Sequence, residues 1–126
     1  MSEQDNVRIV QAMYAAFGAG DLDTVLGHMA DDIDWQIYGD PAIPFVGPRH
    51  GRDAVAANFQ ALFETTEFED FKPEEFIAQG DYVVVLGHDH RRVKATGKTL
   101  HNHWAMVFTL RDSQVTRFRA YEESPG

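Results

Sequence analysis

The chain of 126 residues contains no cysteine, which excludes disulfide bonds, thiol catalysis and cysteine-bound metal sites. It also lacks a long apolar run. A membrane-spanning helix needs about 20 apolar residues, whereas the longest run, Tyr82 to Gly87, has the length of a strand. Basic residues are few, 11 against 20 acidic ones, which leaves a formal net charge of −9. Because this charge repels nucleic-acid phosphates and anionic lipid heads, we expect neither nucleic acid nor a membrane as partner.

Bulky side chains are what the sequence has in quantity, with nine Phe, four Tyr and two Trp among 44% hydrophobic residues. They suffice for a packed core or an apolar pocket in one domain covering residues 1–126. The acidic, polar segment at residues 1–6 does not resemble a secretory signal, so we expect a cytoplasmic protein. The one basic cluster, residues 91–94, alternates along an apolar segment and favours a solvated strand edge.

Three helices are predicted in the N-terminal half. Apolar residues at helical spacing indicate helices over residues 6–17 and 22–29, and a third that opens at Asp53 and carries Phe59 on its apolar face. Alternation of apolar and polar residues, including Trp35, indicates a strand over residues 33–38.

The segment between that strand and the third helix, residues 39–51, contains three prolines and three glycines. It is predicted to be an irregular loop, and a loop of this length in a small domain is often a flap over a site. His50 stands at its end, near the expected pocket mouth, where it either takes part in catalysis or caps the helix.

Strands dominate the C-terminal half. A loosely alternating segment at residues 65–78 precedes three long antiparallel strands over residues 82–93, 99–110 and 115–122, joined by short turns. Helices followed by strands in this order indicate an α+β fold. We expect a curved, mainly antiparallel sheet that three helices cover incompletely, which leaves a pocket on its inner face.

Strand alternation predicts which side chains share that pocket. If Trp104 and Met106 face inward, Asn102 does too, whereas the histidines beside it face outward. A two-residue turn at residues 96–97 would pair Trp104 with Asp89. The predicted interior holds Trp35, Asp89, Asn102, Trp104 and Glu122, with Tyr14 and His50 at its margins.

Asp89 is the leading candidate for catalysis. A carboxylate beside two indoles is desolvated, as a general acid or base often is, and Asn102 would orient the substrate or a water. The alternative is that Asp89 forms a structural ion pair with Arg91 and takes no part in chemistry.

The histidines of the same two strands form a second constellation. The predicted register places His90 opposite His103, with His88 on the same outer face, so that three imidazoles could converge on Zn²⁺. The alternative is that they are packing or interface residues, and we expect no cofactor.

Six motifs carry a resemblance to a known family. They are Gly20-Asp21-Leu22, Met29-Ala30-Asp31-Asp32-Ile33 before Trp35, His50-Gly51-Arg52-Asp53, Glu75 to Val85, Trp104-Ala105-Met106-Val107-Phe108 and Arg117-Phe118-Arg119-Ala120-Tyr121. On these motifs the whole chain resembles the nuclear transport factor 2-like superfamily, in its SnoaL-like and ketosteroid-isomerase-like branch. The resemblance implies the cone-shaped fold and a homodimer through the outer face of the sheet. It does not select a function, because this fold hosts several chemistries.

Ketosteroid isomerases of this fold use a tyrosine, a protonated aspartic acid and an aspartate base. The resemblance places these three positions on Met13, Met106 and Ile37, with Tyr14 about 100° further around the helix. The isomerase set is therefore missing. Two functions remain open: an isomerase-, cyclase- or hydrolase-type acid–base enzyme acting on a small hydrophobic molecule, or a non-catalytic small-ligand-binding or accessory domain.

Overall fold

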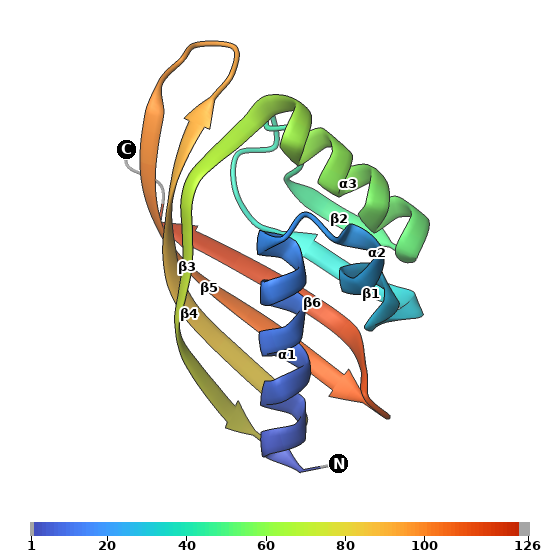
Figure 1. Ribbon diagram of the computed structural model, residues 1–126. Coiled ribbons are helices and arrows are strands. Elements are labelled where there is room, and N and C mark those ends of the chain that lie inside the picture. Colours follow the sequence, from blue (N-terminus) through green and yellow to red (C-terminus); the bar gives the residue numbers. More distant parts are fainter. Residues whose placement is uncertain (1, 124–126) are drawn as a thin grey trace.

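The computed structural model describes residues 2–123 (Figure 1). It contains three helices, α1 Glu3–Gly18, α2 Leu22–Gly27 and α3 Arg52–Thr65, and six strands, β1 Met29–Ile37, β2 Gly47–His50, β3 Thr66–Gln79, β4 Tyr82–Val93, β5 Thr99–Arg111 and β6 Gln114–Glu123. The strands form one sheet in the order β2-β1-β6-β5-β4-β3, and only β1 and β6 pair in parallel. This curved, mainly antiparallel sheet with helices from the N-terminal half confirms the α+β fold class.

All three helices lie on the concave face of the sheet (Figure 1). α1 packs against β3 and β4, whereas α3 packs against β1 and β2 at the other side of the sheet. The sheet therefore bends around the helices, and the space between the two layers holds both the core and the candidate site. No helix within residues 2–123 combines the length and apolar character that crossing a bilayer requires.

Side-chain caps decide where the first two helices begin. The Ser2 hydroxyl accepts a hydrogen bond from the amide of Asp5, and the Asp5 carboxylate accepts one from the amide of Ser2. This capping box starts α1 three residues before the predicted Asn6. Asp21 caps α2 by accepting a hydrogen bond from the amide of Thr24.

Two predictions between α2 and α3 were wrong. Met29 begins β1 rather than ending α2, because its side chain is buried in the sheet where it pairs with Val115. Residues 47–50 form the short strand β2 rather than loop, since they pair with β1 from Asp34 to Ile37. Proline within this segment hid the strand in the sequence, although an edge strand tolerates it.

The predicted register of β4 and β5 was wrong by two residues. Gly87 lies opposite Trp104, and Asp89 lies opposite Asn102. The cause is the connecting turn. The amide of Val93 donates to the carbonyl of Lys98 at 2.8 Å, so four residues, not two, form the loop. Because the slip is an even number, every side chain keeps its predicted face.

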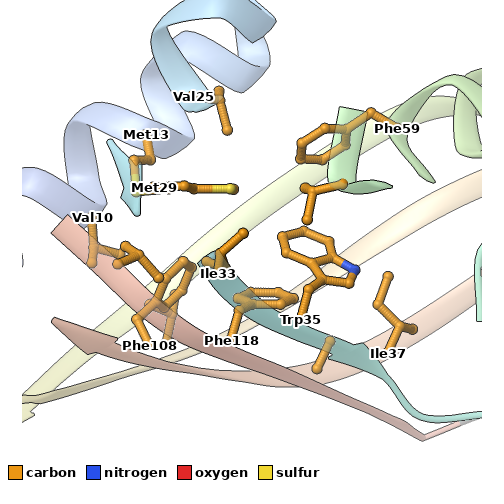
Figure 2. Close-up of a cluster of buried hydrophobic side chains, with 14 of the residues drawn as sticks. Val10, Met13, Val25, Met29, Ile33, Trp35, Ile37, Phe59, Phe108 and Phe118 are labelled. Atoms are coloured by element: carbon orange, nitrogen blue, oxygen red, sulfur yellow. The ribbon is translucent and has the colours of Figure 1, made fainter. Parts of the chain in front are cut away.

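The core lies between the helices and the half of the sheet formed by β1, β6 and β5. Figure 2 shows Met13 of α1, Val25 of α2 and Phe59 of α3 pointing toward the sheet residues Trp35, Phe108 and Phe118. The rings of Trp35 and Phe118 stack with centroids 4.1 Å apart. This packing fixes the aromatic side chains that also form one wall of the cavity described next.

Candidate functional site

A largely apolar cavity of about 90 Å³ lies between the helices and the concave face of the sheet. Side chains of all three helices and of β1, β3, β4, β5 and β6 line it. Three of its lining residues carry a hydroxyl or a charged group: Tyr14 on α1, Arg91 on β4 and Glu122 on β6. A cavity of this character favours a compact apolar ligand that bears a polar group.

Tyr14 lines this cavity beside Met106. The hydroxyl donates to the sulfur of Met106 at 2.9 Å, and the ring stacks on Trp104 with centroids 6.0 Å apart. Burial raises the pKa of Tyr14 well above 10.0, so the phenol keeps its proton at neutral pH. Because thioether sulfur is a weak acceptor, a ligand oxygen in the cavity would be a better partner for this hydroxyl.

Glu122 is the carboxylate on the cavity wall. Its Oε1 accepts a hydrogen bond from Arg91 at 2.7 Å, and its side chain is 17% exposed. Strand alternation predicted this inward orientation. A carboxylate that borders an apolar space and has one hydrogen-bonded oxygen is placed to exchange a proton with a bound molecule.

Asp89, in contrast, does not line the cavity. The side chain is fully buried, and both carboxylate oxygens accept hydrogen bonds from Arg91, at 2.9 and 2.6 Å. The amide of Asn102 contacts the same carboxylate at 3.4 Å and also lies outside the cavity wall. The structure therefore shows the ion pair that was the alternative for Asp89, and Asn102 supports this pair rather than a ligand.

The comparisons with known proteins agree with this architecture. Residues 10–118 match the sequence profile of the SnoaL-like domain. The chain belongs to the SnoaL-like family. A search of curated proteins finds no match.

Solved structures of similar proteins share the whole fold of this SnoaL-like chain. A nuclear transport factor 2-like protein from Burkholderia xenovorans is 41% identical, with a TM-score of 0.88 over 98% of this chain and 92% of that chain. A second, of unknown function, from Burkholderia pseudomallei is 27% identical, with the same TM-score and coverage. TerC, co-crystallized with polyporic acid, is 27% identical with a TM-score of 0.80, covering 94% of this chain and 92% of TerC.

The three isomerase positions of this superfamily can now be placed. Met13, Ile37 and Met106 all line the cavity, so the positions match the site although the polar side chains are missing. Tyr14, predicted at the margin of the pocket, lines the cavity together with Met13. The SnoaL-like chain therefore has a phenol in the cavity, next to Met106.

The other predicted site residues divide into two groups. Trp35, Phe59 and Met106 line the cavity. Trp104 does not line it: the indole stacks on Tyr14 and lies over Gly87, where an added Cβ would come within 2.7 Å of the indole Cζ2. His50 is exposed at the end of β2 and is absent from the cavity wall.

Sequence reasoning missed Arg91, which was assigned to a solvated edge but is only 6% exposed. The signal was present, because Arg91 follows Asp89 by two residues and so shares its inward face. Phe45, a buried residue of the loop predicted as a flap, also lines the cavity.

The four histidines of β4 and β5 lie on the outer face of the sheet. His90 faces His101 rather than His103, with ring centroids 4.2 Å apart, so the predicted zinc geometry was wrong. His88 and His90 instead contact Glu74 and Asp70 of β3. Among residues 2–123, no group of three or more His, Asp or Glu side chains is arranged to hold a metal ion.

Proposed function

We propose that this SnoaL-like chain binds a compact, mainly apolar small molecule in the cavity and promotes proton transfer on it, in the manner of an isomerase, cyclase or hydrolase. The observation that carries the proposal is the joint presence of Tyr14 and Glu122, the latter paired with Arg91, on the wall of one largely apolar cavity. A neutral donor and a carboxylate that share a water-poor space form an acid–base pair for a carbonyl compound.

Each polar group has a distinct role in this proposal. The Tyr14 hydroxyl leaves the sulfur of Met106 and donates to the ligand oxygen. The Glu122 carboxylate takes a proton from the neighbouring carbon, and the electron pair moves to the oxygen that Tyr14 holds. Arg91 bridges Glu122 and Asp89 and so keeps the Glu122 carboxylate in place.

Binding is tested with two fluorinated probes that differ in one group, fluorobenzene and para-fluoroacetophenone, observed by fluorine NMR. Wild-type protein should bind both, and Tyr14→Phe should weaken only the ketone, by about tenfold, the value of one hydrogen bond. Equal weakening of both probes would contradict a hydrogen bond from the Tyr14 hydroxyl to the ketone. Polyporic acid belongs in the same panel, because TerC was co-crystallized with it.

Proton transfer is tested by exchange of the methyl protons of para-fluoroacetophenone with heavy water. Wild-type protein should accelerate the exchange, and Glu122→Gln should abolish it while the ketone still binds. The glutamine retains an oxygen that accepts from Arg91, so the cavity keeps its shape. Binding without any acceleration would instead support the second candidate, a non-catalytic binding or accessory domain, which the predominantly apolar lining equally suits.

A further inference from the structure

A second hollow of about 540 Å³ lies beside the cavity, between the end of α1, the end of α3 and the first half of β3. The two hollows share four lining side chains: Tyr14, Phe17, Phe68 and Phe71. These four residues, here called the aromatic partition, therefore separate the inner cavity from the outer hollow.

The aromatic partition is held mainly by ring contacts. Phe71 touches the other three rings, with centroid distances of 5.1 Å to Phe17, 5.2 Å to Phe68 and 6.1 Å to Tyr14. The one hydrogen bond of these four side chains within residues 2–123 joins the Tyr14 hydroxyl to the weakly accepting sulfur of Met106. Displacing a ring thus breaks dispersion contacts and no strong polar bond.

Phe71 also stacks on Trp104, with centroids 5.1 Å apart, but irregular strand pairing flanks it on both sides. It lies on β3, an edge strand that pairs only with β4. The register shifts on both sides of it, between Phe68 and Asp70 and again between Pro73 and Glu75. Such irregularities weaken the strand pairing locally and re-aim side chains, often beside binding sites.

The outer hollow is more polar than the inner cavity. Its charged lining residues are Glu67, Glu69, Asp70 and Lys94. Glu67 and Asp70 have cationic or histidine partners on β4, whereas the hydrogen-bond partner of Glu69 within residues 2–123 is the hydroxyl of Thr99. The excess of carboxylates favours a neutral or cationic polar group over an anion.

We propose that the aromatic partition is the entrance to the inner cavity and that the natural ligand is elongated. Its apolar, ring-sized head lies in the inner cavity, and its neutral or cationic tail lies in the outer hollow. The entrance opens when the Phe71 ring turns away from Phe17. This inference rests on the proposed function, since it extends the same cavity.

The entrance is tested with para-fluorophenylbutylamine, whose fluorophenyl head and amine tail match the two hollows. Phe71→Ala should speed the association and dissociation of this probe by about tenfold, as removal of a gate does. Phe76→Ala is the matched control: Phe76 lies on the same strand and contacts Tyr14 at 5.9 Å but lines neither hollow. Phe71→Leu replaces the alanine variant if that variant does not fold. Equal rate changes at residues 71 and 76 would overturn the proposed entrance.

The tail is tested by comparing this amine with para-fluorophenylbutyrate, which has the same head and an anionic end. The amine should bind several-fold more tightly at low salt, and both added salt and Glu69→Gln should reduce the difference. Equal affinities would overturn the placement of the tail while fluorobenzene binding keeps the proposed function intact. If neither fluorobenzene nor either tailed probe binds, the proposed function itself fails, and this inference fails with it.

Discussion

Arg91 binds both carboxylate oxygens of Asp89 inside the protein, at 2.9 and 2.6 Å. Two residues of one strand thus form a buried ion pair, with Asp89 fully buried and Arg91 6% exposed. Because Arg91 also holds Glu122, the pair fixes the position of the carboxylate on the cavity wall. In the proposed function, Asp89 therefore positions Arg91, and Glu122 carries the proton transfer.

Asp89→Asn should destabilise the fold by about 3 kcal/mol, because the substitution leaves the buried guanidinium with one carboxylate, that of Glu122, instead of two. Asp34→Asn is the matched control, since Asp34 pairs with Arg119 at 2.9 Å but is 55% exposed, and it should cost less than about 1 kcal/mol. Urea unfolding measures both free energies. Equal costs for the two variants would contradict the structural role of the buried pair.

Tyr14 should make the free energy of unfolding fall at alkaline pH. Burial raises its pKa in the folded state well above 10.0, whereas an unfolded tyrosine titrates at about 10. Above that pH the unfolded chain loses the phenolic proton first, so the Tyr14 contribution to stability is complete below pH 10 and falls as the pH rises further. The difference in unfolding free energy between wild type and Tyr14→Phe should shrink accordingly. Tyr82→Phe, at an exposed ring, should retain the wild-type profile.

Gly87 leaves room for the indole that supports Tyr14. A Cβ at residue 87 would lie 2.5 Å from the backbone oxygen of Lys72 and would also meet the ring of Trp104. Gly87→Ala should therefore destabilise the protein by about 2 kcal/mol and change the near-ultraviolet circular dichroism of Trp104. Gly18→Ala, with nothing within 4 Å of the added methyl, should be neutral or stabilising. Similar thermal melts for the two variants would contradict the close approach.

The order of helices and strands predicted the fold class, and alternation along the strands predicted the faces of their side chains. It placed Trp35, Met106 and Glu122 on the inner face and the histidines on the outer face, because this pattern depends only on neighbouring residues. The register depended on turn geometry, and a four-residue loop at residues 94–97 moved every pairing by two.

The boundary of the cavity could not be read from the sequence. Asp89 and Glu122 both face inward, yet Arg91 covers one and leaves the other at the cavity wall. Which of the two carboxylates reaches the cavity wall depends on how side chains from separate strands and α1 pack together. Tyr14 and Met13 share the wall for the same reason, since the width of a cavity follows from packing between layers.

A homodimer through the outer face of the sheet stays a prediction, and we propose Leu86 as its test. Large apolar side chains are exposed on this face: Ile77, Tyr82, Leu86 and Tyr121. Light scattering at low micromolar concentration should give the mass of a dimer, and Leu86→Glu should give the mass of a monomer. Ile43→Glu, at an exposed position in the loop between β1 and β2, should remain dimeric. A monomeric wild type would contradict the prediction.

The methionines of the cavity wall report most directly on whether a small molecule binds there. Met13, Met29 and Met106 come from α1, β1 and β5, and all three line the cavity. With the methionine methyl groups labelled, addition of para-fluoroacetophenone should shift the signals of all three. The Met106 signal should shift most, because the Tyr14 hydroxyl would leave the Met106 sulfur and donate to the ketone oxygen instead. Tyr14→Phe should reduce the Met106 shift to that of the other two methionines. Methyl signals that do not move at saturating probe would contradict a ligand site in this cavity.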